Sequence, residues 1–210
     1  MSKIKNLPNH IFQRTFNPIF HLPIGDNPPK EVNMMVENPM GSINKYEYNT
    51  ETGLLKLDRV LYERLPYPVE YGAIPQTWDP DQDPLDIMCL VTTPTFPGCI
   101  ISARPIGVML FNDCGEVDNK ILAVPTDDIR FSNIRDLTDV TRHQLEEITF
   151  FMEHYKDLQL KYKGQPKLKV KVEGWEDKSV AHQLINEAAN LFKKTFGEDG
   201  QKRDALKKLR

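Results

Sequence analysis

Four aspartates lie within eight residues near the middle of the chain, in the segment Asp-Pro-Asp-Gln-Asp-Pro-Leu-Asp at 79–86. An isolated acidic run is usually a solvated loop, and that interpretation is the alternative here. Carboxylates this close repel one another unless a cation neutralises them. The apolar run 87–91 follows directly, which places Asp86 at the mouth of a buried strand. Because carboxylate oxygens suit hard cations such as Mg²⁺ and Mn²⁺, we interpret the segment as a divalent-metal site.

The spacing of these aspartates does not fit an EF-hand loop, the obvious competitor. Counting from Asp79, the sixth position is Pro84, where the sharp turn needs glycine. The twelfth position is Leu90, where a bidentate glutamate is needed. A second acidic group, Asp-Cys-Gly-Glu-Val-Asp at 113–118, lies in the turn before Lys120. It could bring further carboxylates to the same place.

Basic and phenolic side chains accompany these acidic loops. They are Lys45, Arg59, Tyr67, Tyr71, Tyr155 and Lys156. Taken singly, each has a structural explanation: Lys45 with Glu47 could be a surface pair, and Tyr155 lies on the apolar stripe of a predicted helix. Their functional interpretation therefore depends on the whole set meeting in space.

The bulk properties of the 210-residue chain limit its class. A net charge of −3 gives no general attraction to nucleic acid or to an anionic membrane. The three cysteines form no C-x-x-C pair, which indicates a reducing, cytoplasmic environment rather than a disulfide framework. No apolar stretch reaches transmembrane length, and residues 1–20 lack the apolar core of a signal peptide.

The elements that must position these residues are mostly short strands. Brief apolar or alternating runs predict strands at 33–37, 45–48, 54–59, 87–91, 100–108, 121–124 and 168–172. Helical periodicity predicts helices at about 141–158 and 179–196, preceded by an irregular proline-rich arm at about 1–30 and followed by a polar, frayed or solvated tail at 197–210. We expect one domain over 1–210, of α+β class and mainly β: a small closed five-stranded OB-like barrel with flanking helices.

The segment 81–87 resembles the D-x-D-P-x-D signature of the family I soluble inorganic pyrophosphatases. The similarity extends from about residue 27 to residue 196. Other blocks that match in order include Lys45-Tyr46-Glu47, Thr52-Gly53-Leu54, Asp58-Arg59, Tyr67-Pro68, Tyr71-Gly72, Arg104-Pro105-Ile106-Gly107, Ala123-Val124-Pro125, His154-Tyr155-Lys156-Asp157-Leu158 and Val172-Glu173-Gly174-Trp175.

The resemblance implies a role for each matching residue. Metal ligands would be Asp81, Asp86, Asp118 and, as a further one, Asp113. Asp83 would take the proton from the attacking water. Substrate oxygens would be held by Lys45, Arg59, Tyr71, Tyr155 and Lys156, with Lys120 as a secondary member. Tyr67, Glu37 and Glu47 would form the surrounding shell.

The resemblance also implies Mg²⁺ as cofactor, replaceable by Mn²⁺ or another divalent ion, pyrophosphate as substrate, and a homo-oligomer, with a hexamer favoured over a dimer. The chain departs from the family pattern at two places. Cys114 stands where the family often has glutamate, which removes one acidic group of the outer metal shell. The stretch between Glu37 and Lys45 is one residue shorter than in common bacterial members.

Three alternatives stay open at this point. A phosphohydrolase acting on nucleotides would need a base-binding pocket, for which the sequence offers no clear candidate. A barrel that binds single-stranded nucleic acid would need a basic groove, which the net charge and the aspartate clusters oppose. A catalytically dead relative is disfavoured because Asp81, Asp83, Asp86 and Asp118 are all present.

Overall fold

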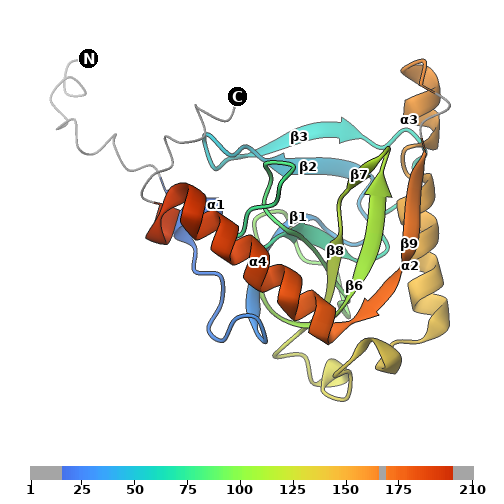
Figure 1. The fold of residues 1–210 in the computed structure, drawn as a ribbon. Coiled ribbons are helices and arrows are strands. Elements are labelled where there is room, and N and C mark those ends of the chain that lie inside the picture. The colour runs from blue at the N-terminus through green and yellow to red at the C-terminus, as the bar shows by residue number, and fades with distance from the viewer. Residues whose placement is uncertain (1–15, 166–168, 201–210) are drawn as a thin grey trace, which may run out of the picture.

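The computed structural model describes residues 16–165 and 169–200, and its centre is a closed barrel (Figure 1). The strands of the ring are β1 (Val32–Asn38), β4 (Glu70–Ala73), β5 (Asp86–Cys89), β8 (Lys120–Pro125) and β6 (Ile100–Asp113). They pair in the order β1-β4-β5-β8-β6, and β6 pairs back with β1. The β5–β8 pair is parallel and the other pairs of the ring are antiparallel. The predicted five-stranded, OB-like barrel of a mainly β fold is confirmed.

The remaining elements surround this ring. They are the helices α1 (Pro18–His21), α2 (Arg142–His154), α3 (Asp157–Tyr162) and α4 (Lys178–Phe196), the 3₁₀ turns η2 (Ile129–Phe131), η3 (Leu137–Asp139) and η4 (Glu198–Gly200), and the strands β2 (Asn44–Tyr48), β3 (Leu55–Val60), β7 (Glu116–Val117) and β9 (Val170–Asp177). β2 and β3 form a separate hairpin, whereas β7 and β9 pair with β6. In Figure 1, α2 lies alongside β9.

Successive side chains of a strand point to opposite sides of the sheet. In β5 the side chains on both sides are buried, and they enter two different clusters. Ile87 belongs to a cluster that includes Ile185 of α4. Met88 belongs to a second cluster that includes Ile148 and Met152 of α2. Strands covered on both faces consist of continuous apolar residues, which is the pattern the sequence shows at 87–91.

The prediction of one long helix at 141–158 is wrong in the last turn of that helix. Its capping box is present, since the Thr141 side chain accepts from the backbone N–H of Gln144. The helix then ends at His154, and α3 begins at Asp157. Tyr155 and Lys156 lie at the break between the two helices, where neither is part of a regular helix.

The ends of the chain also differ from the expectation. The arm at 1–30 contains a helical turn, α1, in which Ile19 and Phe20 are buried in one cluster with Phe192 and Phe196 of α4. The tail begins with η4, and its remainder, 201–210, lies outside the described residues. Residues 1–15 of the arm and residue 168 of the strand predicted at 168–172 lie outside them as well. That strand extends further than expected, because β9 continues to Asp177 to pair with the long β6.

Gly72 of β4 lies against the backbone of β1, and an added Cβ would come 1.9 Å from the carbonyl oxygen of Met35. We expect Gly72→Ala to lower the free energy of unfolding by about 3 kcal/mol, because the two strands would have to move apart. Urea unfolding measures this. Gly41→Ala is the control, since its Cβ would meet nothing within 4 Å and its φ of +85° costs about 1 kcal/mol for a non-glycine residue. Equal losses in the two variants would contradict the steric explanation.

Candidate active site

A cavity of about 350 Å³ brings together residues from distant parts of the chain. The predicted site residues that line it are Glu37, Lys45, Glu47, Tyr71, Asp81, Asp83, Asp86, Asp113, Asp118, Tyr155 and Lys156. They come from β1, β2, β4, β5, the end of β6, the loops 74–85 and 118–119, and the break between α2 and α3. Arg59, Lys120 and Tyr67 do not line the cavity.

The loop between β4 and β5 is a tight turn that presents the central aspartates. The backbone N–H of Asp79 donates to the carbonyl oxygen of Asp83 at 2.9 Å, and Gln82 takes a positive φ of +72°. The N–H of Asp83 donates to Oδ1 of Asp81 at 3.1 Å. The Thr77 hydroxyl accepts from the N–H of Leu85 at 3.0 Å, which fixes the end of the loop. Asp81 and Asp83 therefore project from a defined backbone.

Crowding and burial raise the pKa of several of these carboxyl groups. Burial raises the pKa of Asp83 to about 7, with Asp81 and Asp86 adding to the effect. Burial likewise raises the pKa of Asp118 to about 6, although Lys120 opposes it. The nearby carboxylates, which repel one another when charged, thus add to the effect of burial. This set of carboxylates fits a divalent cation, whose positive charge would lower these pKa values again.

Lys120 is buried between two of the predicted metal ligands. Its side chain is 1% exposed, and its ammonium group pairs with Asp86, at 2.5 Å, and with Asp118. The Tyr71 hydroxyl donates to the same Asp86 oxygen at 2.6 Å. Burial alone would lower the pKa of Lys120, but the two carboxylates outweigh it and raise the pKa. Lys120 thus holds Asp86 and Asp118 from behind, outside the residues that line the cavity.

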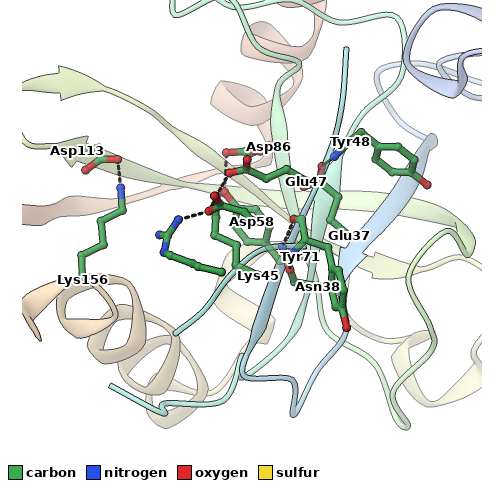
Figure 2. A network of polar contacts seen from close by, with 12 residues as sticks. Glu37, Asn38, Lys45, Glu47, Tyr48, Asp58, Tyr71, Asp86, Asp113 and Lys156 are labelled. Atoms are coloured by element: carbon green, nitrogen blue, oxygen red, sulfur yellow. Dashed lines mark hydrogen bonds and ion pairs between the residues drawn. The ribbon is translucent and has the colours of Figure 1, made fainter. Parts of the chain in front are cut away.

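The helix break carries a second cation to the cavity. Lys156 pairs with Asp113, and Figure 2 shows these two side chains pointing toward one another. Burial would raise the pKa of Asp113, but Lys156 keeps it below its usual range. The Lys156 ammonium lies 5.3 Å from the centroid of the Tyr155 ring, and that ring stacks on Phe151 at 5.4 Å.

The β2–β3 hairpin supplies the other basic groups. Lys45 and Arg59 are register partners across the hairpin. Asp58 pairs with Arg59 and lies 3.9 Å from the Lys45 ammonium, while Lys45 also pairs with Glu47 (Figure 2). The Arg59 Nε is buried and has no hydrogen-bond partner among the described residues.

The two remaining shell residues, Glu37 and Tyr67, are both buried. Glu37 accepts the backbone N–H of Tyr48 at 2.8 Å, and burial raises its pKa to about 8. Tyr67 is 3% exposed, and its ring packs 4.8 Å from Phe151 and 5.7 Å from Tyr71. The position of Tyr67 is that of a core aromatic residue behind Tyr71.

Within residues 16–165 and 169–200, no three His, Cys, Asp or Glu side chains already stand together as a ready coordination shell. Lysines separate the carboxylates instead: Lys120 contacts Asp86 and Asp118, and Lys156 contacts Asp113. A divalent ion would have to compete with these lysines for the same oxygens.

Sequence reasoning missed some residues of this region. Ile19 of α1 and Glu116 of β7 line the cavity, and Asp58 contacts both cations of the hairpin. Glu116 belongs to the acidic group 113–118 that follows β6, two residues after Cys114. A neighbouring cavity of about 680 Å³, lined by Asp79, Trp78 and α4, shares Asp81 and Glu116 with the first but contains none of the basic groups.

Comparisons with known proteins identify the family of the chain. Residues 34–193 match the family model described as inorganic pyrophosphatase. The chain is 45% identical over 165 residues to an inorganic pyrophosphatase of Halalkalibacterium halodurans, an alignment that covers 79% of this chain and 97% of the relative. It is 43% identical over 172 residues to that of Haloferax volcanii, covering 82% and 94%.

A solved structure shows the same fold. The crystal structure of the inorganic pyrophosphatase from Thermus thermophilus superposes with a TM-score of 0.78 at 40% identity, covering 83% of this chain and 98% of that one. The nucleotide-hydrolase and nucleic-acid-binding alternatives gain no support from these relatives. The chain belongs to the inorganic pyrophosphatase family and is an enzyme that hydrolyses pyrophosphate.

Proposed function

We propose that hydrolysis takes place in the 350 Å³ cavity and depends on divalent ions, Mg²⁺ in the first place and Mn²⁺ in substitution. Asp81, Asp86, Asp118 and Asp113 would hold the ions. The observation that carries the proposal is the convergence of these carboxylates with Lys45 and Lys156 on one cavity. When bound, the ions supply positive charge to the phosphates and acidify a water molecule.

Asp83 is the proposed proton acceptor. It lines the cavity beside Asp81 and is not one of the four proposed metal ligands, so its carboxylate is available to accept a proton. Its backbone N–H, bonded to Asp81, keeps the carboxylate at the edge of the proposed metal site. The attacking water would transfer a proton to an Asp83 carboxylate oxygen as its oxygen bonds to one phosphorus atom. The bond from that phosphorus to the bridging oxygen breaks, and the other phosphate leaves with the bridging oxygen.

The basic and phenolic groups are proposed to bind the two phosphates. Lys45 and Lys156 act as point charges, and the Tyr71 and Tyr155 hydroxyls add neutral donors. Arg59 does not line the cavity, and its Nε has no partner among the described residues. Its guanidinium would leave Asp58 to make a bidentate phosphate contact. The basic side chains Lys45, Arg59 and Lys156 each pair with a carboxylate, and an oxygen of the substrate would take the place of that carboxylate. Because of its burial, we assign Lys120 to holding Asp86 and Asp118 rather than to substrate.

Glu37, Glu47 and Tyr67 are proposed to orient the groups that touch substrate or metal. Glu47 pairs with Lys45, and Tyr67 packs against Tyr71. Glu37 lines the cavity beside Lys45 and Glu47.

The assay that tests this proposal measures phosphate release from pyrophosphate and from nucleoside triphosphates, with Mg²⁺ and with a chelator. We expect release from pyrophosphate that needs Mg²⁺ and is far faster than release from the nucleotides. Unchanged activity in the chelator would contradict the metal requirement. A gel-shift assay at low salt checks the nucleic-acid alternative.

Metal binding should become tighter as the pH rises from 5 to 8. Carboxylates must lose their protons to bind a cation, and burial raises the pKa of Asp118, a proposed ligand, to about 6. Below this pKa protonation competes with Mg²⁺, and above it protonation does not. We expect affinity to increase about 10-fold, with proton release, in calorimetric titrations with Mg²⁺. The exposed-residue variant Glu173→Gln should behave like wild type, and an affinity independent of pH would refute the explanation.

We further propose a homo-oligomer, with a hexamer favoured over a dimer, in a reducing cytoplasm. Exposed apolar side chains such as Phe150, 57% exposed on α2, support self-association. The free thiols of Cys89, Cys99 and Cys114 support a reducing compartment. Over the described ranges, the structure contains no helix with the length and apolar character needed to cross a bilayer. Light scattering measures the oligomeric state.

A further inference from the structure

The turn between β3 and β4 reaches across to the beginning of α3. Glu63, in this turn, accepts the backbone N–H of Leu158 at 2.5 Å and that of Gln159 at 3.3 Å through Oε1. We propose that Glu63 is a positioning residue that sets Tyr155 and Lys156 in the catalytic cavity. The inference rests on the proposed role of these two residues in binding substrate.

The first turn of α3 depends on this distant side chain. The first N–H groups of any helix lack partners within the helix. Lys156, the residue at the N-cap of α3, makes no capping hydrogen bond with its side chain. Glu63 supplies the missing acceptor from 95 residues away in the sequence. The start of α3, and so the direction of the chain leaving Lys156, is set from outside the helix.

One further contact holds the turn on α3, and a hydrogen bond closes the turn itself. The rings of Tyr62 and Tyr162 stack with centroids 6.1 Å apart at an interplanar angle of 26°. The backbone N–H of Arg64 donates to the carbonyl oxygen of Leu61, and Arg64 has a positive φ of +52°. Glu63 is thus fixed between an aromatic contact and a closed turn, four residues after Arg59 at the end of β3.

The helix break is the feature that this contact explains. The sequence favours one continuous helix through residue 158, whereas the structure ends α2 at His154. At this break Lys156 pairs with Asp113 and lines the cavity. Holding the N–H groups of Leu158 and Gln159 on Glu63 prevents that continuation, because the same N–H groups would otherwise bond to carbonyl groups of the preceding turn. The other carboxylate oxygen of Glu63, Oε2, is buried without a hydrogen-bond partner among the described residues. Burying an unpaired oxygen destabilises the fold, which favours a positioning role for Glu63.

The experiment compares Glu63→Ala, Glu63→Gln and Lys156→Ala with wild type at saturating Mg²⁺. We expect Glu63→Ala to lower kcat/KM for pyrophosphate about 10-fold, because misplacing a substrate contact by about 1 Å has an effect of this order or larger. Glu63→Gln keeps an acceptor oxygen and should stay within about threefold of wild type. In the Lys156→Ala background, Glu63→Ala should cause a clearly smaller further loss, since the Lys156 contact is already absent and only the displacement of Tyr155 remains. Hydrogen exchange at the amides of Leu158 and Gln159 should become faster in Glu63→Ala.

Thr141→Ala is the matched control, because Thr141 caps the other end of α2, away from the cavity. It should lower the thermal midpoint and leave kcat/KM within about twofold. A folded Glu63→Ala enzyme with wild-type kcat/KM, or a loss that adds fully to that of Lys156→Ala, would overturn the inference alone. Wild-type kcat/KM in Lys156→Ala would instead overturn the proposed substrate role of Lys156, and the inference with it. Should Glu63→Ala not fold, the same comparison applies to Glu63→Ser, which loses the reach to α3.

Discussion

Replacing Asp83 with asparagine is expected to lower kcat for pyrophosphate hydrolysis by about 10²-fold or more. Asparagine has nearly the same shape and keeps the loop, whose bonds near this residue are made by its backbone N–H and carbonyl groups. It cannot take a proton from the attacking water. The loss should therefore fall on kcat, with KM changed much less, and steady-state kinetics at saturating Mg²⁺ measures both.

Asp79→Asn is the matched control for this prediction. Asp79 belongs to the same turn, and burial raises its pKa to about 7 as well. Its side chain lines the neighbouring cavity, however, and not the one that contains the basic groups. We expect its kcat within a few-fold of wild type. A fully active Asp83→Asn enzyme, or equal losses in the two variants, would show that Asp83 is not the proton acceptor.

Lys120→Met should lower the free energy of unfolding by about 3 kcal/mol when no divalent cation is present. Methionine fills a similar length but leaves Asp86 and Asp118 facing one another without a cation between them. This value lies at the low end for a broken buried pair because the two carboxylates are 23% and 25% exposed. Addition of Mg²⁺ should restore part of the loss, since the ion neutralises the same two groups. Denaturant unfolding with and without Mg²⁺ measures both effects.

The control for Lys120 is Lys171→Met. Lys171 pairs with Glu173 at 3.0 Å, but the two side chains are 63% and 48% exposed. An ion pair this exposed contributes less than about 1 kcal/mol, and Mg²⁺ should not influence the variant differently from wild type. If Lys120→Met were as stable as wild type without metal, Lys120 would not be what holds the two carboxylates together.

The acidic loop and the barrel could be predicted because their signals are local. The four aspartates are adjacent in sequence, and the apolar runs of β5 and β8 mark strands covered on both faces. β4 escaped prediction because Glu70, which is fully buried, and Gly72 are poor strand formers whose place is decided by β1 and β5.

Other parts of the site depend on contacts that no local pattern contains. Lys120 reaches Asp86 because β5 and β8 pair in parallel with these two residues in register. The break at Tyr155 and Lys156 depends on Glu63, 95 residues from its partner Leu158. Periodicity within 141–158 describes the helix correctly up to that tertiary contact and fails beyond it.

We propose that Asp81, Asp86 and Asp118 coordinate divalent ions beside Lys45 and Lys156. Anomalous diffraction from crystals grown with Mn²⁺ tests this coordination. We expect anomalous peaks inside the cavity, within bonding distance of oxygens from these three aspartates. Peaks only at other surfaces of the protein, with the three carboxylates still held by lysines or turned apart, would contradict it.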